Sequence, residues 1–143
     1  MAFDAIDEAL IALLSANARE STAELARKLN LSRSTVKDRV SRLERQGVIQ
    51  GYGVKLAESY GEGHISAHVT IDVEPRASAQ IVRQLGKIPA VKALYAVNGV
   101  HDLIAIIRTA STQALDQALD QIGAIDGIVR TVSSIVLSTK FER

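Results

Sequence analysis

The sequence contains no cysteine and no tryptophan, and only two of its 143 residues are proline. Without cysteine the chain cannot form a disulfide, a thiol nucleophile or a zinc site with cysteine ligands. It also lacks a long uncharged apolar run. The first residues, "MAFDAIDEALIALLSANARE", have no basic start and carry acids among the apolar positions, which is unlike a signal peptide or a bilayer-spanning helix. We therefore expect a soluble, cytoplasmic protein with no membrane contact.

The composition is that of a folded protein with 47% hydrophobic and 23% charged residues, enough apolar surface for one ordinary domain or two small ones. The net charge is only +1, but it is unevenly distributed. Residues 27–45 hold seven basic and two acidic side chains, a net +5, whereas residues 56–143 hold eight basic and nine acidic ones, a net −1. A basic segment on a nearly neutral body indicates contact with a polyanion or a solvated helix face.

Helices are predicted at the start of the chain. Apolar residues recur at helical spacing over residues 4–16, where Asp4 is placed to cap the N-terminus. A second helix begins at Ser21, because "STAE" has the pattern of a capping box. Ser21 would accept from the amide of Glu24, whose carboxylate would reach back to the amide of Ser21.

A third helix is predicted over residues 32–46 after a break of only three residues, 30–32. Ser32 or Ser34 can cap it, and Gly47 suits the left-handed position that ends a helix. Its apolar stripe is narrow, and the opposite face is polar and basic. The stripe contains Val36, Val40 and Leu43; the opposite face contains Ser34, Asp38, Ser41 and Arg45, flanked by Thr35, Lys37 and Arg42.

Two helices joined by so short a turn are typical of a helix-turn-helix, whose second helix enters the major groove of DNA. Small hydroxyl side chains allow close approach to base edges, and basic side chains reach phosphates. Asp38 would repel phosphate. It therefore either pairs with Arg42 one turn later or accepts from a cytosine amino group.

The segment "VIQGYGVKL" after Gly47 suits a strand or small wing. The polar stretch "ESYGEGH" that follows predicts a domain boundary. We expect a winged helix-turn-helix domain with a connecting strand over residues 1–60 and a second domain over residues 61–143.

The second domain is predicted to be a ferredoxin-like sandwich of the α+β class. Strict alternation in "HISAHVTIDV" predicts a strand, and residues 77–88 have helical periodicity. "VKALYAV" and "DLIAIIRT" predict two strands joined by the turn "NGVH", and a last helix and strand follow. The order strand, helix, strand, strand, helix, strand is βαββαβ, with both helices on one face of the sheet.

An apolar second sheet face predicts a homodimer. If Leu103, Ala105 and Ile107 face the helices, Ile104 and Ile106 point to the side without helices. A second copy of the same face is the simplest cover for them.

Neither a metal site nor a catalytic site is predicted. His64 and His68 would lie about 13 Å apart on a strand, too far to share one ion. The chain has no nucleophile and base pair, no phosphate loop and no dinucleotide fingerprint. We expect no cofactor and no enzymatic activity.

The turn "NGVHD" has two interpretations. Gly99 suits a tight turn and nothing more. Alternatively, Asp102 beside His101, with exposed backbone amides, could hold a small zwitterion. Thr131, Ser133 and Ser134 would bring hydroxyls from the last strand, or they are ordinary sheet-face hydroxyls.

The sequence resembles the Lrp/AsnC (leucine-responsive, feast/famine) transcriptional regulators. The resemblance is carried by "LSRSTVKDRVSRLERQGVIQGY", by "VNGVHDLI" and by "RTVSSIVLS", and it covers nearly the whole chain. It implies a winged helix-turn-helix joined to an amino-acid-binding regulatory (RAM) domain. It further implies dimers that assemble to tetramers or octamers, and binding of double-stranded DNA that responds to a small effector.

From the residues we expect that the hydroxyl side chains and Asp38 lie nearest the base edges and that the basic side chains mainly contact phosphates. The expected DNA-contacting residues are Arg33, Ser34, Thr35, Lys37, Asp38, Arg39, Ser41, Arg42 and Arg45. The resemblance implies effector contacts by Asn98, Gly99, Val100, His101 and Asp102, with Thr131, Ser133 and Ser134. We predict a nucleoid-associated regulator. The alternative is a ligand-independent DNA-organising protein of the same fold.

Overall fold

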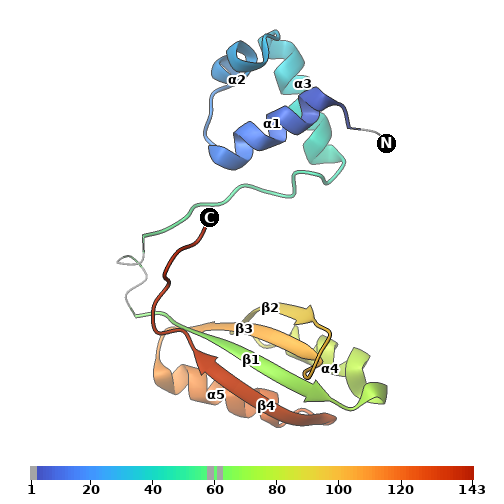
Figure 1. Cartoon of the computed structure of the whole chain (residues 1–143), viewed down its shortest axis with the longest axis vertical. Coiled ribbons are helices and arrows are strands. Elements are labelled where there is room, and N and C mark those ends of the chain that lie inside the picture. Colours follow the sequence, from blue (N-terminus) through green and yellow to red (C-terminus); the bar gives the residue numbers. More distant parts are fainter. Residues whose placement is uncertain (1–2, 58–59, 61–62) are drawn as a thin grey trace. The chain divides into compact units, whose positions relative to one another are not determined.

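The structure, a computed structural model, describes residues 3–57, 60 and 63–143 (Figure 1). The chain divides into two compact units, Met1–Leu56 and Ala57–Arg143. In the described part of the chain, no helix is long and apolar enough to cross a bilayer.

The first unit contains the three expected helices, α1 (Ala5–Ala16), α2 (Thr22–Leu29) and α3 (Arg33–Arg45). Asp4, Ser21 and Ser32 are their N-caps, and each side chain accepts a hydrogen bond from a backbone amide of the first turn. The three helices enclose a small apolar core of buried side chains: Leu10, Leu25, Ala26, Val36 and Leu43.

The turn between α2 and α3 is made by Asn30, which has a left-handed φ of 54°. Asparagine tolerates this conformation better than most residues. After α3, Gly47 has a φ of 71°, and the amides of Val48 and Gly47 donate to the carbonyls of Leu43 and Glu44. This pairing is a Schellman motif, which satisfies the last carbonyls of the helix.

Two local expectations are wrong for this unit. The carboxylate of Glu24 binds Arg27 (Oε2–Nη2 2.9 Å), so the described residues form only the half of the capping box that Ser21 supplies. Residues 50–57 have extended backbone but form no strand. A strand needs a neighbouring strand for its amides and carbonyls, and the described chain places none beside this segment.

The second unit has the predicted βαββαβ order. Its elements are β1 (Ile65–Val73), a 3-10 turn η2 (Pro75–Ala77), α4 (Ser78–Leu85), β2 (Val91–Ala96), β3 (Leu103–Thr109), α5 (Thr112–Gly123) and β4 (Ile128–Ile135). The strands form one antiparallel sheet in the order β2-β3-β1-β4. Both helices lie on the same face of this sheet (Figure 1).

The alternation of side chains along β3 is confirmed. Leu103, Ala105 and Ile107 are buried in the core that contains side chains of both helices, whereas Ile104 and Ile106 are half-buried on the opposite face. We call this opposite face the open sheet face. The register places Ile104 beside Tyr95 of β2 and Thr70 of β1, and Thr70 is in turn opposite Val132 of β4.

Candidate nucleic-acid interface and ligand site

The outer face of α3 is polar and accessible, as expected. Arg33, Ser34, Lys37, Asp38 and Arg45 are exposed, while Thr35 and Ser41 are half-buried. The N-terminal turn gathers three hydroxyls. The Oγ atom of Ser32 lies 2.7 Å from the Oγ1 atom of Thr35 and 3.1 Å from the Oγ atom of Ser34. These short side chains leave room for base edges at the start of α3.

The seven basic side chains between residues 27 and 45 fall into two groups. Four have carboxylate partners within the unit: Arg27 with Glu24, Lys28 with Glu20, Arg39 with Asp4 and Asp7, and Arg42 with Asp7. Arg33, Lys37 and Arg45 have no ion pair with any residue that the structure describes. Three exposed cations therefore remain available for a phosphate backbone.

The guanidinium groups of Arg39 and Arg42 bind carboxylates at the N-terminus of α1, whereas the sequence predicts that they contact DNA phosphates. The Nη1 atom of Arg39 lies 2.8 Å from Oδ2 of Asp4 and 2.8 Å from Oδ1 of Asp7. The Nη2 atom of Arg42 lies 2.6 Å from Oδ2 of Asp7. Both guanidinium groups are directed toward the N-terminus of α1, where the carboxylates of Asp4 and Asp7 lie.

The predicted pairing of Asp38 with Arg42 is therefore wrong, since Arg42 is bound to Asp7. The carboxylate of Asp38 is exposed and has no hydrogen bond or ion pair with the residues in the described ranges. The other alternative, an acceptor for a cytosine amino group, stays a prediction.

Asp4 and Asp7 also form the capping box of α1. The amide of Asp7 donates to Oδ1 of Asp4 (2.9 Å), and the amide of Asp4 donates to Oδ2 of Asp7 (3.3 Å). The hydrogen bond from Arg39 holds the pKa of the Asp4 carboxyl below its ordinary value, and the same contact raises the pKa of Arg39. The sequence interpretation missed Asp7. The sequence feature that could have indicated its burial is that Asp7 is in helical register with Leu10 and Leu14, on the apolar side of α1.

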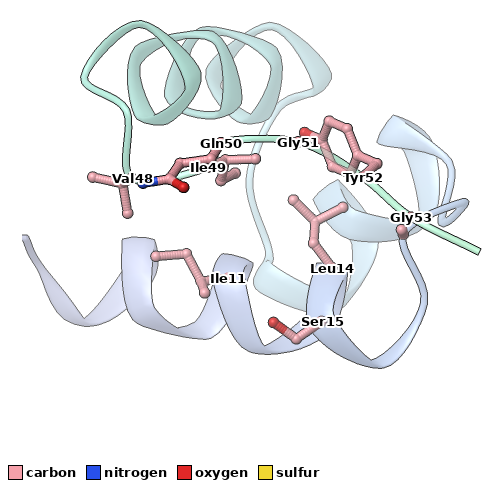
Figure 2. Close-up of a pocket in the computed structure, with 10 residues that line it drawn as sticks. Ile11, Leu14, Ser15, Val48, Ile49, Gln50, Gly51, Tyr52 and Gly53 are labelled. Atoms are coloured by element: carbon pink, nitrogen blue, oxygen red, sulfur yellow. The ribbon is translucent and has the colours of Figure 1, made fainter. Parts of the chain in front are cut away.

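A cavity of about 320 Å³ lies between α1 and the segment that follows α3 (Figure 2). Ile11 and Leu14 of α1 face Val48, Ile49 and Tyr52 across it. The hydroxyl of Tyr52 donates to the Oε1 atom of Glu44 on α3 (2.7 Å), and this bond raises the pKa of Tyr52. Among the residues that the structure describes, no charged side chain lines this cavity, which makes it a poor site for a zwitterion.

The hairpin between β2 and β3 is the turn that the sequence singled out. Gly99 has a φ of 115°, which only glycine adopts without strain, and Val100 is 87% exposed at its tip. Asp102 joins the hairpin to β1. Its amide donates to the carbonyl of Ile71 (3.2 Å), and its Oδ2 atom accepts from the amide of Val73 (2.9 Å).

Charged side chains gather beside this hairpin. The Nδ1 atom of His101 lies 2.8 Å from Oδ1 of Asp72, and the Nε atom of Arg130 lies 3.4 Å from Oδ2 of Asp72. Asp72 and Arg130 were missed by the sequence interpretation. They lie opposite each other in the β1–β4 register, which local periodicity does not reveal.

The structure separates the three predicted hydroxyls of β4. Thr131 pairs with Ile71, which pairs with Leu103 at the base of the hairpin, so Thr131 lies in the same row as the hairpin end. Ser133 and Ser134 pair with Val69 and His68, two and three residues further from that row, or about 7–10 Å along the strand. In the described residues, no group of three or more histidine or acidic side chains could hold a metal ion.

Two family models match the two units. A winged helix-turn-helix DNA-binding model matches residues 3–50, and the Lrp/AsnC ligand-binding domain matches residues 66–143.

Relatives match over nearly the whole chain. The HTH-type transcriptional regulator LrpA of Mycobacterium tuberculosis is 37% identical, over 96% of this chain and 92% of its own length. The regulator LysM of Saccharolobus solfataricus is 30% identical, over 96% of both chains. Among solved structures, the feast or famine regulatory protein of M. tuberculosis in complex with L-methionine has a TM-score of 0.87 and 34% identity. That match covers 99% of this chain and 96% of the other.

Proposed function

Because this chain belongs to the Lrp/AsnC family of transcriptional regulators, we propose how its sites work. A homodimer binds operator DNA through α3, and an amino-acid effector held at the β2–β3 hairpin changes its assembly and its DNA affinity. The chain has the helix-turn-helix and the ligand-binding domain that such a regulator needs. The proposal concerns which residues contact DNA and the effector, how the chain assembles, and which class of effector it binds.

The observation that carries the proposal is the division of the basic side chains of the first unit. Arg33, Lys37 and Arg45 are exposed without carboxylate partners in the described chain, and they flank the hydroxyl side chains of α3. Cations on phosphates supply affinity, whereas short polar side chains at base edges supply sequence preference. We assign base contacts to Ser34, Thr35, Asp38 and Ser41.

A homodimer through the open sheet face explains the apolar side chains on that face. Ile104 and Ile106 are half-buried there, and Tyr95 and Val132 are 55% and 46% exposed. An apolar patch of this kind on a four-stranded sheet is best buried against the same patch of a second copy. A two-fold dimer carries two α3 helices, so its operators are expected to be roughly palindromic. Assembly of such dimers to tetramers or octamers is part of the proposal.

The hairpin supplies complementary charges for a zwitterion. Asp72 and Asp102 provide carboxylates, while Arg130 and His101 provide cationic or hydrogen-bonding groups beside them. We place the effector against residues 98–102 and Thr131; Ser133 and Ser134, about 7–10 Å further along β4, are not part of this proposed contact. The similar M. tuberculosis structure was determined with L-methionine, which supports an amino acid as the class of ligand.

An effector changes DNA binding only if it binds one assembly state better than another. Coupling of this kind typically amounts to about 1–3 kcal/mol, or a change of about 5- to 150-fold in affinity. The alternative function is a ligand-independent DNA-organising protein, associated with the nucleoid, in which the hairpin is only a turn.

Sedimentation separates the two functions. The purified protein would be titrated with each standard amino acid in turn, with and without the DNA upstream of its own coding sequence. A shift in assembly with one amino acid, together with altered DNA affinity, supports the regulator. Tight DNA binding with no response to any of them contradicts the amino-acid effector and favours the organising protein.

A further inference from the structure

A buried carboxylate links α1 to the DNA-binding helix. The side chain of Asp7 is only 2% exposed, and it lies in the first turn of α1. A carboxylate so removed from water requires charged or hydrogen-bonding partners. Its partners are Arg39 and Arg42, both on α3, and separated from it by 32 and 35 residues in the sequence.

Arg42 is placed where it could otherwise reach DNA. At about 100° per residue, its Cα lies about 40° around the α3 axis from that of Asp38, which is exposed on the outer face. The Nη2 atom of Arg42 nevertheless contacts both oxygens of Asp7, at 2.7 and 2.6 Å. The side chain is therefore drawn away from the outer face and toward α1.

Arg39 contacts two carboxylates, whereas Arg42 contacts one. Its Nη1 atom contacts Asp4 and Asp7, and its side chain is only 20% exposed. The four charges of this cluster sum to zero, so Arg39 and Arg42 add little to the positive potential of α3. A guanidinium that is already bound to a carboxylate gains less from a phosphate and releases fewer counterions on DNA binding.

We propose that Asp7 is a positioning residue, which holds Arg39 and Arg42 against α1 and so keeps two cations of the DNA-binding helix away from DNA phosphates. The inference rests on DNA binding through α3, as proposed above. Phosphate contacts strengthen binding to all sequences alike. Withholding two of them lowers the affinity for operator and non-operator DNA alike and makes binding less dependent on salt.

The test compares Asp7→Asn with Glu8→Gln by measuring DNA affinity as a function of salt concentration. Both variants remove one negative charge from the first turn of α1. Glu8 is exposed and has no ion pair among the described residues. Each protein would be titrated onto a mixed-sequence duplex and onto its own upstream DNA.

With Asp7→Asn we expect tighter binding to both duplexes, by about the same factor. The slope of log affinity against log salt should steepen by about 0.9 for each additional phosphate that the protein neutralises. Glu8→Gln should leave this slope close to that of the wild type. If Asp7→Asn behaves like Glu8→Gln, the inference is wrong. A merely structural role would weaken binding without steepening the slope, and that result would also overturn it.

A further variant keeps the test decisive if Asp7→Asn is poorly folded. Asp4→Asn keeps an N-cap acceptor and removes one carboxylate from Arg39, so it should steepen the slope in the same direction by a smaller amount. Where Asp7→Asn is folded, Arg42→Gln shows which cation was released: it should change the slope little in the wild type and should lower the steepened slope of Asp7→Asn by about 0.9. Failure of the wild type to bind either duplex would refute the proposed function itself.

Discussion

The carboxylate of Asp102 accepts a hydrogen bond of 2.9 Å from the amide of Val73, which joins the β2–β3 hairpin to the end of β1. The β1–β4 register shifts at this point, between Asp72 and Val73. Asp102 therefore has a structural contact as well as its proposed role toward an effector. The two roles can be separated by substitution, because one needs only an acceptor and the other needs a negative charge.

Replacing Asp102 with Asn should abolish the effector response while DNA affinity and assembly without effector stay unchanged. The Asn carbonyl can still accept from Val73, but it carries no charge for an ammonium group. Asp102→Ala should in addition lower the free energy of unfolding by about 1 kcal/mol, because the Val73 amide loses its acceptor. Sedimentation with and without the effector measures the response. Asp116→Asn, on the exposed surface of α5, is the control. A normal response in Asp102→Asn would place the effector elsewhere.

The unpaired cations of α3 should set the salt dependence of DNA binding. Replacing Arg33, Lys37 or Arg45 with Ala should weaken binding to all sequences and flatten the slope of log affinity against log salt by about 0.9 for each phosphate that is no longer neutralised. Affinity at several salt concentrations measures the slope. Arg83→Ala removes an exposed cation from α4 of the second unit and should leave the slope unchanged. If the three α3 variants have the same slope as the control Arg83→Ala, the assignment of these side chains to DNA is wrong.

A charge on the open sheet face should prevent dimerisation. Ile104 lies in the central row of that face, beside Tyr95 and Thr70. Ile104→Lys would bury an unpaired ammonium in the dimer interface, which is strongly unfavourable. Sedimentation at micromolar concentration should therefore show a monomer. Val82→Lys changes an exposed apolar side chain on α4 (42% exposed) and should leave the dimer intact. A monomeric wild type would refute the dimer proposal directly.

The ion pair between Asp4 and Arg39 should make stability depend on acid pH. The pKa of Asp4 is lowered in the folded chain from 3.8, so its stabilisation is complete above that value. It is lost as the pH falls through the lower folded-state pKa. Asp4→Asn keeps the cap but cannot form the ion pair. The free energy of unfolding of Asp4→Asn, measured by urea denaturation, should be lower than that of the wild type. This difference should be constant near neutral pH and should shrink below pH 3.8. A deficit that stays constant into strong acid would show that the ion pair contributes nothing.

Close packing at Gly127 should make this position intolerant of a side chain. Gly127 has a φ of 93°, and an added Cβ would lie 2.5 Å from the Cβ of Ala77. Gly127→Ala should lower the free energy of unfolding by about 2–5 kcal/mol, from the left-handed backbone and the steric overlap. Gly123→Ala is the control, because Gly123 lies in α5 with no atom within 4 Å of an added Cβ. Similar denaturation midpoints for the two variants would contradict this.

Much of the fold follows from local patterns. The caps at Asp4, Ser21 and Ser32, the left-handed stop at Gly47 and the turn at Gly99 depend on residues within one turn of each other. The alternation of Leu103 and Ile104 reports which face of a strand is buried. These features require only neighbouring residues in the chain, and the sequence predicted them, leaving open only whether Ser32 or Ser34 caps α3.

The partners of the charged side chains were decided only by the tertiary structure. The sequence pattern placed Arg39 and Arg42 on a DNA-facing helix, but it contains no information that Asp7 lies beside them once α1 packs on α3. The same is true of Asp72 with His101 and Arg130, which meet through sheet register. The strand expected after Gly47 failed for a related reason, since extended backbone becomes a strand only when another segment supplies its hydrogen bonds. Periodicity determines which face of an element is buried; packing between distant segments determines which charges on its edges remain free to bind.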